Sequence, residues 1–333
     1  MAMERVRVKL DAMRVGIVGC GGMGSVHANK YVQMPDVTIT AFDLDKEKLN
    51  AFCEARPVSP MDSLESLIQE CDAIDVCLPT PIHRDVAVAA LEAGKPTLVE
   101  KPLARTVADC EAMIAAADSS GALLVPAHVV RFFPEHRAAH EFISAGKLGT
   151  PASVRVRRGG GAPKMDWFMD SKASGGILLD LAVHEFDWLL WTLGPATQVT
   201  SRTVRLGNTV ADTEFRGDYA LTTLSFANGC VAHVESTWMD PAGSRVTIEA
   251  SGSDGMIEFD SRNNPSLRVA TGTMATENIA TAADDPYYRQ LRAFVDAAHG
   301  KAPPAVTAQE GLAAVRIACA AIESAESGET VWL

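Results

Sequence analysis

The stretch that decides the fold is Arg14-Val-Gly-Ile-Val18, followed without a break by Gly19-Cys20-Gly21-Gly22-Met23-Gly24. Its first five residues are apolar enough for a buried strand, and its glycines have the GxGxxG spacing of a phosphate-binding turn that leads into a helix. Such glycines let a pyrophosphate approach the backbone closely, and the N-terminus of the following helix supplies N–H donors. The stretch predicts a dinucleotide-binding βαβ unit in which residues 19–24 contact the cofactor. An ordinary glycine-rich turn is the alternative.

Short apolar strands alternate with helical segments through the first half of the chain, which predicts a parallel sheet with right-handed crossovers. Glu65 completes a capping box that begins at Asp62, and Gly94 and Gly121 mark helix ends. We expect a Rossmann domain over residues 13–130. Its predicted strands are Arg14–Val18, Val37–Phe42, Ala73–Leu78, Thr97–Glu100 and Leu123–Pro126.

The second half has a different pattern, in which alternating strands follow one another and Asn228-Gly229 is a strong hairpin signal. It predicts an α+β domain over residues 131–306 with a large, mostly antiparallel sheet, covered by helices on one face and free to dimerise on the other. A last segment, 307–333, holds a helix that we expect to pack back near the Rossmann domain. The predicted strands are Ala152–Arg158, Gln198–Arg205, Ala220–Phe226, Val231–Trp238, Arg245–Ala250, Met256–Phe259 and Leu267–Val269, and the helices are Pro134–Ala145, Asp285–His299 and Thr307–Ser324.

Composition excludes several classes of function. The net charge of −12 argues against nonspecific binding of nucleic acid or of an anionic membrane, because both need a basic face. The seven cysteines show no spacing typical of a zinc site, so we expect reduced thiols and no metal. No apolar run reaches the length of a membrane span, and the first dozen residues resemble a short tail or an upstream start, not an export signal. These features favour a cytoplasmic enzyme.

Asp43 ends the second predicted strand, where a carboxylate can accept hydrogen bonds from the adenosine ribose. A negative charge there repels the 2′-phosphate of NADP, and neither Leu44 nor Asp45 offers a cation to hold that phosphate. We therefore expect NAD to be preferred over NADP. The alternative role, capping the helix that begins at Lys46, is open to either aspartate.

Lys101 follows the predicted strand Thr97–Glu100, at the sheet edge where open α/β folds bind their ligands. An ammonium group there can polarise a substrate hydroxyl, whereas an exposed loop lysine is the alternative. Asp180 and His184 are four residues apart on a predicted helix and so share one face, which Asp187 continues. A histidine suits proton transfer and a carboxylate one turn away can orient it. A solvated ion pair on a helix surface is the other reading.

These elements, in this order, resemble the Gfo/Idh/MocA oxidoreductases, the family of glucose–fructose oxidoreductase and inositol dehydrogenase. The similarity covers nearly the whole chain, and its specific part is the Glu-Lys-Pro element with the later Asp-x-x-x-His. It implies a rigid turn after Lys101, so we expect a cis Lys101–Pro102 bond. The matching motifs are Cys77-Leu78-Pro79-Thr80-Pro-Ile-His83, Ala93-Gly-Lys-Pro96, Glu100-Lys101-Pro102 and Gly175-Gly176…Asp180…His184.

The resemblance implies that Lys101 and His184 form the catalytic pair and that Asp180 binds substrate or supports His184. It also implies that Glu100 touches the nicotinamide ribose and that an interdomain segment brings further residues to the site. The remaining cofactor contacts that it implies are Leu78, Pro79, Thr80, His83 and His128. The remaining substrate contacts are Arg131, Arg157, Lys164, Asp166 and Trp167. For all of these except Arg131, an exposed position on a strand or loop is the alternative.

Together these features predict an NAD-dependent oxidoreductase that moves a hydride between nicotinamide and a secondary hydroxyl or keto group of a sugar, polyol or inositol-like substrate. We expect a homodimer or homotetramer. Three alternatives remain: a sugar ketoreductase in the biosynthetic direction, a glycosidase-like enzyme that oxidises its substrate transiently with tightly held NAD, and a noncatalytic ligand-sensing protein. The joint presence of Lys101, Asp180 and His184 argues against the last.

Overall fold

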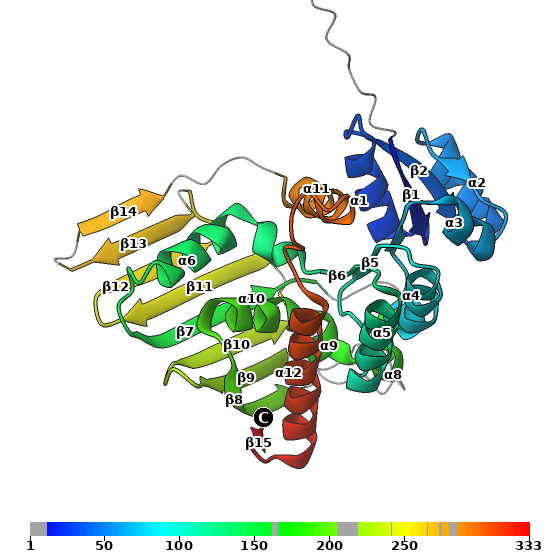
Figure 1. Cartoon of the computed structure of the whole chain (residues 1–333). Helices are drawn as coiled ribbons and strands as arrows, with labels where there is room; N and C mark the ends of the chain where they lie inside the picture. The colour runs from blue at the N-terminus through cyan, green and yellow to red at the C-terminus, as the bar shows by residue number, and fades with distance from the viewer. Residues whose placement is uncertain are drawn as a thin grey trace, which may run out of the picture.

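The chain forms two sheets joined through a shared layer of helices, as Figure 1 shows for the computed structural model. The model describes residues 12–161, 166–204, 219–240, 242–264, 266–272, 275–279 and 285–333. Three expectations concern residues outside these ranges: the N-terminal tail before residue 12, Lys164, and Arg205 as the end of a strand.

The N-terminal half is a six-stranded parallel sheet with the order β3-β2-β1-β4-β5-β6, which confirms the predicted Rossmann architecture. The strand order reverses between β1 and β4, and ligands of such sheets bind beyond the carboxyl ends of the strands at this point. The pattern missed the two-residue strand β3, which is too short to show an alternation. The strands are β1 Met13–Val18, β2 Val37–Phe42, β3 Ser59–Pro60, β4 Ala73–Val76, β5 Thr97–Glu100 and β6 Leu124–Ala127.

Helices cover both faces of this sheet because its strands are apolar on both sides. One face packs against α3, α4 and α5, and the other against α1, α2 and α11. Helix α11 belongs to the second half by sequence, yet its Leu291, Phe294 and Val295 lie in the same core as Val15 of β1. The helices are α1 Gly22–Tyr31, α2 Lys46–Glu54, α3 Leu64–Glu70, α4 His83–Glu92, α5 Val107–Ser120 and α11 Pro286–Ala298.

Local hydrogen bonds at the helix ends test the capping predictions. The capping box at Thr307 and Glu310 is confirmed. The one placed at Asp62 is wrong by one residue, because the Ser63 side chain accepts the N–H of Ser66 and so forms the N-cap of α3. Asp45 accepts two backbone N–H groups at the start of α2, so Asp45, not Asp43, is the capping aspartate.

The C-terminal half is a nine-stranded sheet with the order β14-β13-β12-β11-β7-β10-β9-β8-β15. It is antiparallel except for the central pair β7 and β10, and Asn228-Gly229 forms the predicted hairpin turn between β9 and β10. The sequence analysis missed both edge strands, β14 and β15. The strands are β7 Pro151–Gly159, β8 Ala196–Val204, β9 Tyr219–Phe226, β10 Val231–Thr237, β11 Arg245–Gly252, β12 Gly255–Asp260, β13 Leu267–Thr271, β14 Ala275–Ile279 and β15 Val331–Trp332.

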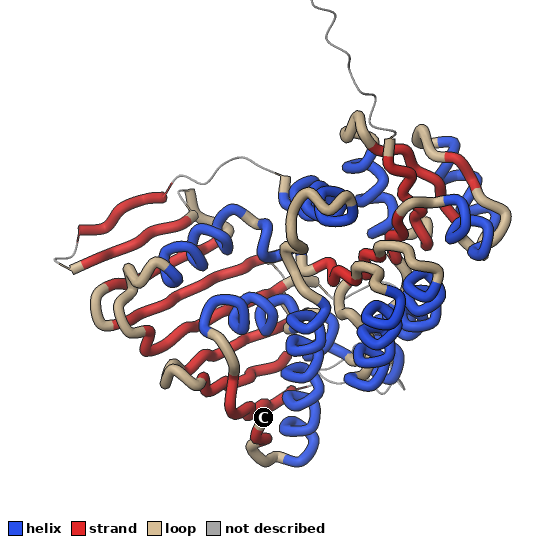
Figure 2. The backbone as a smooth tube through the Cα atoms, in the orientation of Figure 1, coloured by secondary structure: helices blue, strands red, loops and turns tan. Residues whose placement is uncertain are grey.

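Among the described residues, helices lie across one face of this second sheet (Figures 1 and 2). The inward residues of its strands share a core with Trp188 of the covering helices. On the opposite, outer face of β10, Val231 and Glu235 are half-buried and His233 is exposed, whereas Thr237 is buried. The covering helices are α6 Pro134–Ser144, α10 Val183–Leu193 and α12 Ala308–Ser327, and two short 3-10 turns, η1 Thr80–Ile82 and η2 Val129–Phe132, complete the connections.

In the described part of the chain, no helix combines the length and apolar character needed to cross a membrane. All seven cysteines are free thiols, and five of them are buried.

Candidate active site

The glycine-rich turn between β1 and α1 has the close backbone contacts that the sequence predicts. Gly19 has φ of +103°, and a side chain at Gly24 would collide with the carbonyl oxygen of Gly19. By contrast, nothing lies within 4 Å of the Cβ that a residue at 21 would carry. The turn therefore has no room for side chains at Gly19 and Gly24 but leaves free space at Gly21. Gly21 directly precedes a ten-residue helix. This cradle fits a pyrophosphate group.

Asp43 is tied to this turn. Its Oδ2 accepts the backbone N–H of Cys20 at 2.9 Å, and its Oδ1 accepts that of Asp45 at 2.9 Å. The carboxylate therefore lies half-buried between the glycine turn and the end of β2, which is the place expected for a group that binds a ribose.

Lys101 follows β5 directly, and the Lys101–Pro102 bond is cis, as expected. Its Nζ donates to the backbone oxygen of Asp180 at 2.9 Å and to Oδ1 of the same residue at 3.1 Å. The carboxylate of Asp180 therefore pairs with Lys101 and not, as one reading of the sequence held, with His184. This ion pair joins the first sheet to the helical layer of the second domain.

His184 lies close to this pair, although not on an unbroken helix with Asp180. Helix α9 (Gly176–Asp180) ends at that aspartate, and α10 starts at Val183. Burial, and next the positive charges of Lys101 and Arg158, hold the pKa of His184 well below its ordinary value. Its Nδ1 is buried and has no hydrogen-bond partner in the described part of the chain. A neutral imidazole with a free Nδ1 therefore lies within electrostatic reach of the lysine.

Asp187 lies one turn after His184 on α10, but its carboxylate pairs with Arg131. Asp187 is fully buried and accepts two hydrogen bonds from the Arg131 guanidinium, at 2.9 and 2.7 Å. Arg131 also donates to Glu310 at 2.7 Å. His128, at the end of β6, lies 3.8 Å from the Asp187 carboxylate and is almost fully buried. Arg131 therefore joins the interdomain segment to α10 and α12, and its described contacts leave it little capacity for substrate.

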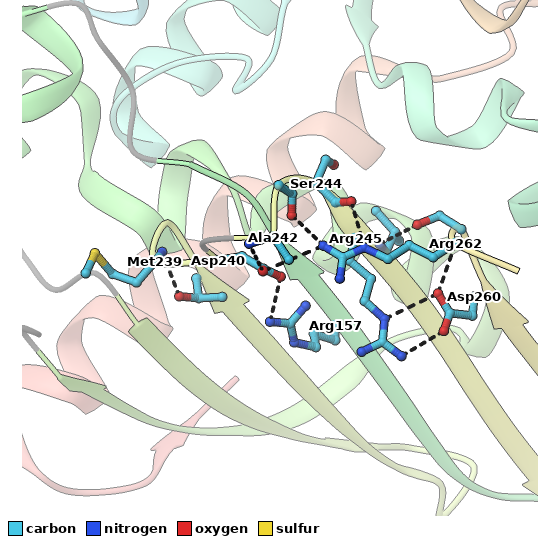
Figure 3. Close-up of polar contacts among 12 residues, drawn as sticks. Arg157, Met239, Asp240, Ala242, Ser244, Arg245, Asp260 and Arg262 are labelled. Carbon is cyan, nitrogen blue, oxygen red and sulfur yellow. Dashed lines mark hydrogen bonds and ion pairs between the residues drawn. The ribbon is translucent and has the colours of Figure 1, made fainter.

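Adjacent arginines on β7 point to opposite faces of the second sheet. Arg157 lies on the outer face, where it donates to Glu235 at 3.0 Å and to Asp240 at 3.1 Å (Figure 3). We therefore no longer expect Arg157 to contact the substrate. Arg158 lies on the helix-covered face and donates from Nε to the fully buried Glu185, the neighbour of His184. Arg158 therefore lies near His184, a position that sequence analysis missed.

The segment after β4 approaches the same edge. His83 is fully buried, with one ring nitrogen 2.8 Å from the carbonyl oxygen of Leu78 and the other 3.1 Å from that of Pro102. It therefore holds the end of β4 against the turn that carries Lys101. Leu78 and Pro79 are half-buried beside it and Thr80 is buried, so the side chains that the resemblance assigned to the cofactor lie together.

Trp167 lies in the short helix α7 (Asp166–Met169), half-buried and with its ring 3.9 Å from that of Phe168. The structure describes no contact of Trp167 with Lys101 or His184. The side chain of Asp166 lies outside the described residues.

Two further groups at this edge carried no signal in the sequence. Glu185 is a fully buried carboxylate within an amphipathic helix pattern. Its ion pair with Arg158 explains why a carboxylate is buried there. His27 lies on α1 and pairs with Glu100 at 3.1 Å, although the two are 73 positions apart in the sequence. Only the three-dimensional fold brings these residues together.

Comparisons with known proteins agree with this geometry. A family model described as an oxidoreductase family with an NAD-binding Rossmann fold, GFO_IDH_MocA, matches residues 13–128. A second model, the C-terminal alpha/beta domain of the same family, matches residues 140–333.

The chain is also similar to named enzymes over nearly its whole length. It is 30% identical to inositol 2-dehydrogenase 1 of Saccharopolyspora erythraea, covering 96% of each chain. It is 26% identical to myo-inositol 2-dehydrogenase of Thermotoga maritima, covering 96% of this chain and 98% of that one. Among solved structures, GenD2 from gentamicin A biosynthesis in complex with NAD aligns with a TM-score of 0.86 at 26% identity, covering 97% of both chains.

The glycine turn generates a prediction about cofactor affinity. We expect Gly24→Ala to weaken NAD binding at least tenfold, about 1.4 kcal/mol, because the new methyl group displaces the Gly19 carbonyl and deforms the cradle. Gly252→Ala is the matched control, since its methyl group also meets backbone oxygens but in the second sheet. Titration of NAD by calorimetry measures both variants. Wild-type affinity in Gly24→Ala would contradict the assignment of the turn.

Proposed function

Since the chain belongs to the Gfo/Idh/MocA family of oxidoreductases, we propose that it transfers a hydride between NAD and a secondary hydroxyl or keto group of a sugar, polyol or inositol-like substrate. The observation that carries the proposal is the meeting of Lys101, Asp180 and His184 beyond the carboxyl end of β5. The inositol dehydrogenases among its relatives support the substrate class.

Proton transfer falls to His184. Because burial and the neighbouring cations keep its imidazole neutral, the ring is ready to accept a proton when an alcohol is oxidised. In this step the substrate O–H proton passes to His184 while the hydride leaves the carbinol carbon and a C=O bond forms. The bound NAD supplies the hydride acceptor.

Lys101 stabilises the oxygen on which negative charge develops. Asp180 holds the ammonium group through two acceptors, its backbone oxygen and Oδ1, so the lysine has one N–H left to offer to the substrate. Asp180 therefore acts in our proposal by positioning Lys101 as well as by contacting a substrate hydroxyl. The same residues serve the reverse reaction, in which a keto group accepts hydride and His184 returns the proton.

The cofactor would lie along the carboxyl edge of the first sheet. The glycine turn Gly19–Gly24 would hold its pyrophosphate, and Asp43 would accept hydrogen bonds from its adenosine ribose. Glu100 and the segment that follows β4 would hold the nicotinamide half. His128, buried at the end of β6, would close the site from the interdomain side.

For substrate contacts we retain Lys101, Asp180, His184 and Trp167, and we replace Arg157 with Arg158. Arg158 lies on the same side of the second sheet as His184. Its hydrogen bond to Glu185 uses Nε, so among its described contacts the two terminal nitrogens stay available to bind a substrate. A guanidinium offers paired donors to vicinal oxygens, the pattern that a sugar or polyol presents.

We also propose that two copies of the chain pair through the outer face of the second sheet. A depression on this face is lined by four arginines and four acidic side chains, including the pair Arg245–Asp260, which Figure 3 shows beside Arg157. Balanced charges of this kind suit a two-fold contact in which each surface meets its own copy. Leu221 is exposed on the same face.

The first prediction concerns the catalytic pair. Lys101→Ala and His184→Ala should each lower kcat by about 10²–10⁴-fold, while NAD binding stays near the wild-type level because neither residue holds the adenosine or the pyrophosphate. Lys95→Ala is the control, because Lys95 lies just before β5 whereas Lys101 lies just after it. The described hydrogen bonds of the Lys95 Nζ go to backbone oxygens at the amino end of the first sheet, away from the site. A panel of sugars and polyols followed by NADH absorbance gives the rates. Near-wild-type turnover in both variants would refute the assignment.

The pH profile gives a second readout on the same pair. Because the ammonium of Lys101 lowers the pKa of His184, its removal should raise that pKa and move the acidic limb of kcat/KM to higher pH. The residual activity of Lys101→Ala, measured from pH 5 to 9, tests the direction of this shift. An acidic limb that stays in place would mean that another group accepts the proton.

The third prediction concerns cofactor choice. Wild type should prefer NAD, and Asp43→Ser should narrow the gap to NADP because the repelling carboxylate is gone. Asp45→Ala is the matched control: it should cost about 1 kcal/mol of stability through the lost helix cap and leave the NAD to NADP ratio of kcat/KM unchanged. Preference of the wild type for NADP at saturating substrate would overturn the role of Asp43.

The fourth prediction concerns assembly. Light scattering at micromolar concentration should give a multiple of the 35.4 kDa chain mass. Leu221→Glu should reduce that mass, because it places an unpaired charge in the proposed contact, whereas Val32→Glu, at an exposed apolar position of the first domain, should not. A monomeric wild type would rule out a stable dimer.

A further inference from the structure

His27 lies at the third position after the glycine turn, on α1, with a fully buried side chain between two carboxylates. Its Nδ1 is 2.8 Å from Oδ2 of Asp75 on β4, and its Nε2 is 3.1 Å from Oε1 of Glu100 at the end of β5. Both carboxylates are themselves buried. The ring therefore spans from the helix of the cofactor cradle to the strand that carries the catalytic lysine.

The charge of this cluster follows from its composition. Burial disfavours an imidazolium, but the carboxylate of Asp75 outweighs it and raises the pKa of His27 well above its ordinary value. Burial likewise opposes ionisation of Glu100, yet His27 and then Lys101 lower the pKa of that carboxyl. His27 is thus a cation shared by two anions. The titratable groups around it are Asp75 on β4, Cys77 directly after β4, Glu100 on β5, Tyr31 on α1 and Tyr287 on α11.

Glu100 connects His27 to the backbone of Lys101 in the candidate active site. While its Oε1 faces His27, its Oε2 accepts the backbone N–H of Lys101 at 3.0 Å. The orientation of the carboxylate therefore sets the backbone at the residue whose Nζ reaches Asp180. No other cation of the described chain is paired with Glu100 at ion-pair distance, so the imidazolium is what holds this side chain in the core.

We propose that His27 is a positioning residue of the reaction, which clamps Glu100 so that Glu100 can meet the nicotinamide half of the cofactor and fix the backbone of Lys101. The inference rests on the proposed function for its kinetic consequence. It also assigns a task to α1 beyond phosphate binding: the helix that cradles the pyrophosphate is connected by one side chain to the strand that carries the catalytic lysine.

Kinetics of His27→Gln test the proposal. Glutamine keeps an amide NH₂ donor but carries no charge, so Glu100 loses its cationic partner in a buried site. We expect kcat to fall by the order of 10- to 100-fold, with a smaller change in KM for NAD, because the glycine turn and Asp43 are intact. Burial, no longer opposed by the charge of His27, should also raise the pKa of Glu100, so the variant should show an acidic limb of kcat at higher pH than the wild type.

A double-mutant cycle separates this role from a loss of stability. In a Glu100→Gln background, His27→Gln should cost little further activity and should not shift the acidic limb again. Cys77→Ser is the matched control: its sulfur lies 3.3 Å from Nδ1 of His27, the ring nitrogen that does not face Glu100, and forms no ion pair, so kcat and its pH profile should stay at the wild-type level. Additive losses in the cycle, or a fall in kcat that merely follows the fraction of folded protein, would overturn the proposal.

The charge of His27 can be measured without any turnover. In protein labelled with ¹⁵N-histidine, the signal absent from His27→Gln should have both ring nitrogens protonated at pH 8. A neutral ring there would refute the clamp, as would a stoichiometric metal in the purified protein, because the ligating atoms of His27, Asp75 and Cys77 lie within 4.8 Å of one another. If wild type oxidises no polyol but the ring is charged, the proposed function fails and the ion-pair cluster stands.

Discussion

The proposed chemistry depends on the ion pair between Lys101 and Asp180. It is the contact at which the carboxyl end of a parallel strand meets helix α9 of the second domain, with the ammonium 2.9 Å from one oxygen of Asp180 and 3.1 Å from another. Parallel strands bring their carboxyl ends to a single edge, so the glycine turn after β1 and the lysine after β5 must face the same space. The second domain closes that space and contributes His184.

Two buried histidines show how the surroundings select opposite states of one side chain. His184 lies among cations, so burial and charge act in the same direction and keep it neutral, as a proton acceptor requires. His27 lies between carboxylates, so their charge overcomes burial and keeps it protonated, as a clamp requires. In the proposed mechanism a neutral ring takes part in the chemistry, and a charged ring holds the groups that do. Both states follow from neighbours that are distant in sequence.

Local patterns predicted the parts of the structure that local physics determines. The glycine turn, the parallel sheet that follows from βαβ units, the hairpin at Asn228-Gly229 and the cap at Thr307 all depend on neighbouring residues, and the structure has them. Contacts made across the fold could not be read in this way. A strand places neighbouring residues on opposite faces, so an assignment wrong by one position exchanged Arg157 for Arg158. The partner of Asp180, the packing of α11 on the first domain and the cluster at His27 depend on tertiary contacts that no local pattern encodes.

A crystal structure with NADH and the best substrate of the panel tests the central claim most directly, since this dead-end complex holds the alcohol without turnover. The account predicts that one secondary hydroxyl oxygen lies within hydrogen-bond distance, about 2.6–3.2 Å, of both Lys101 Nζ and a ring nitrogen of His184. A substrate whose reacting hydroxyl is beyond the reach of both residues would contradict it.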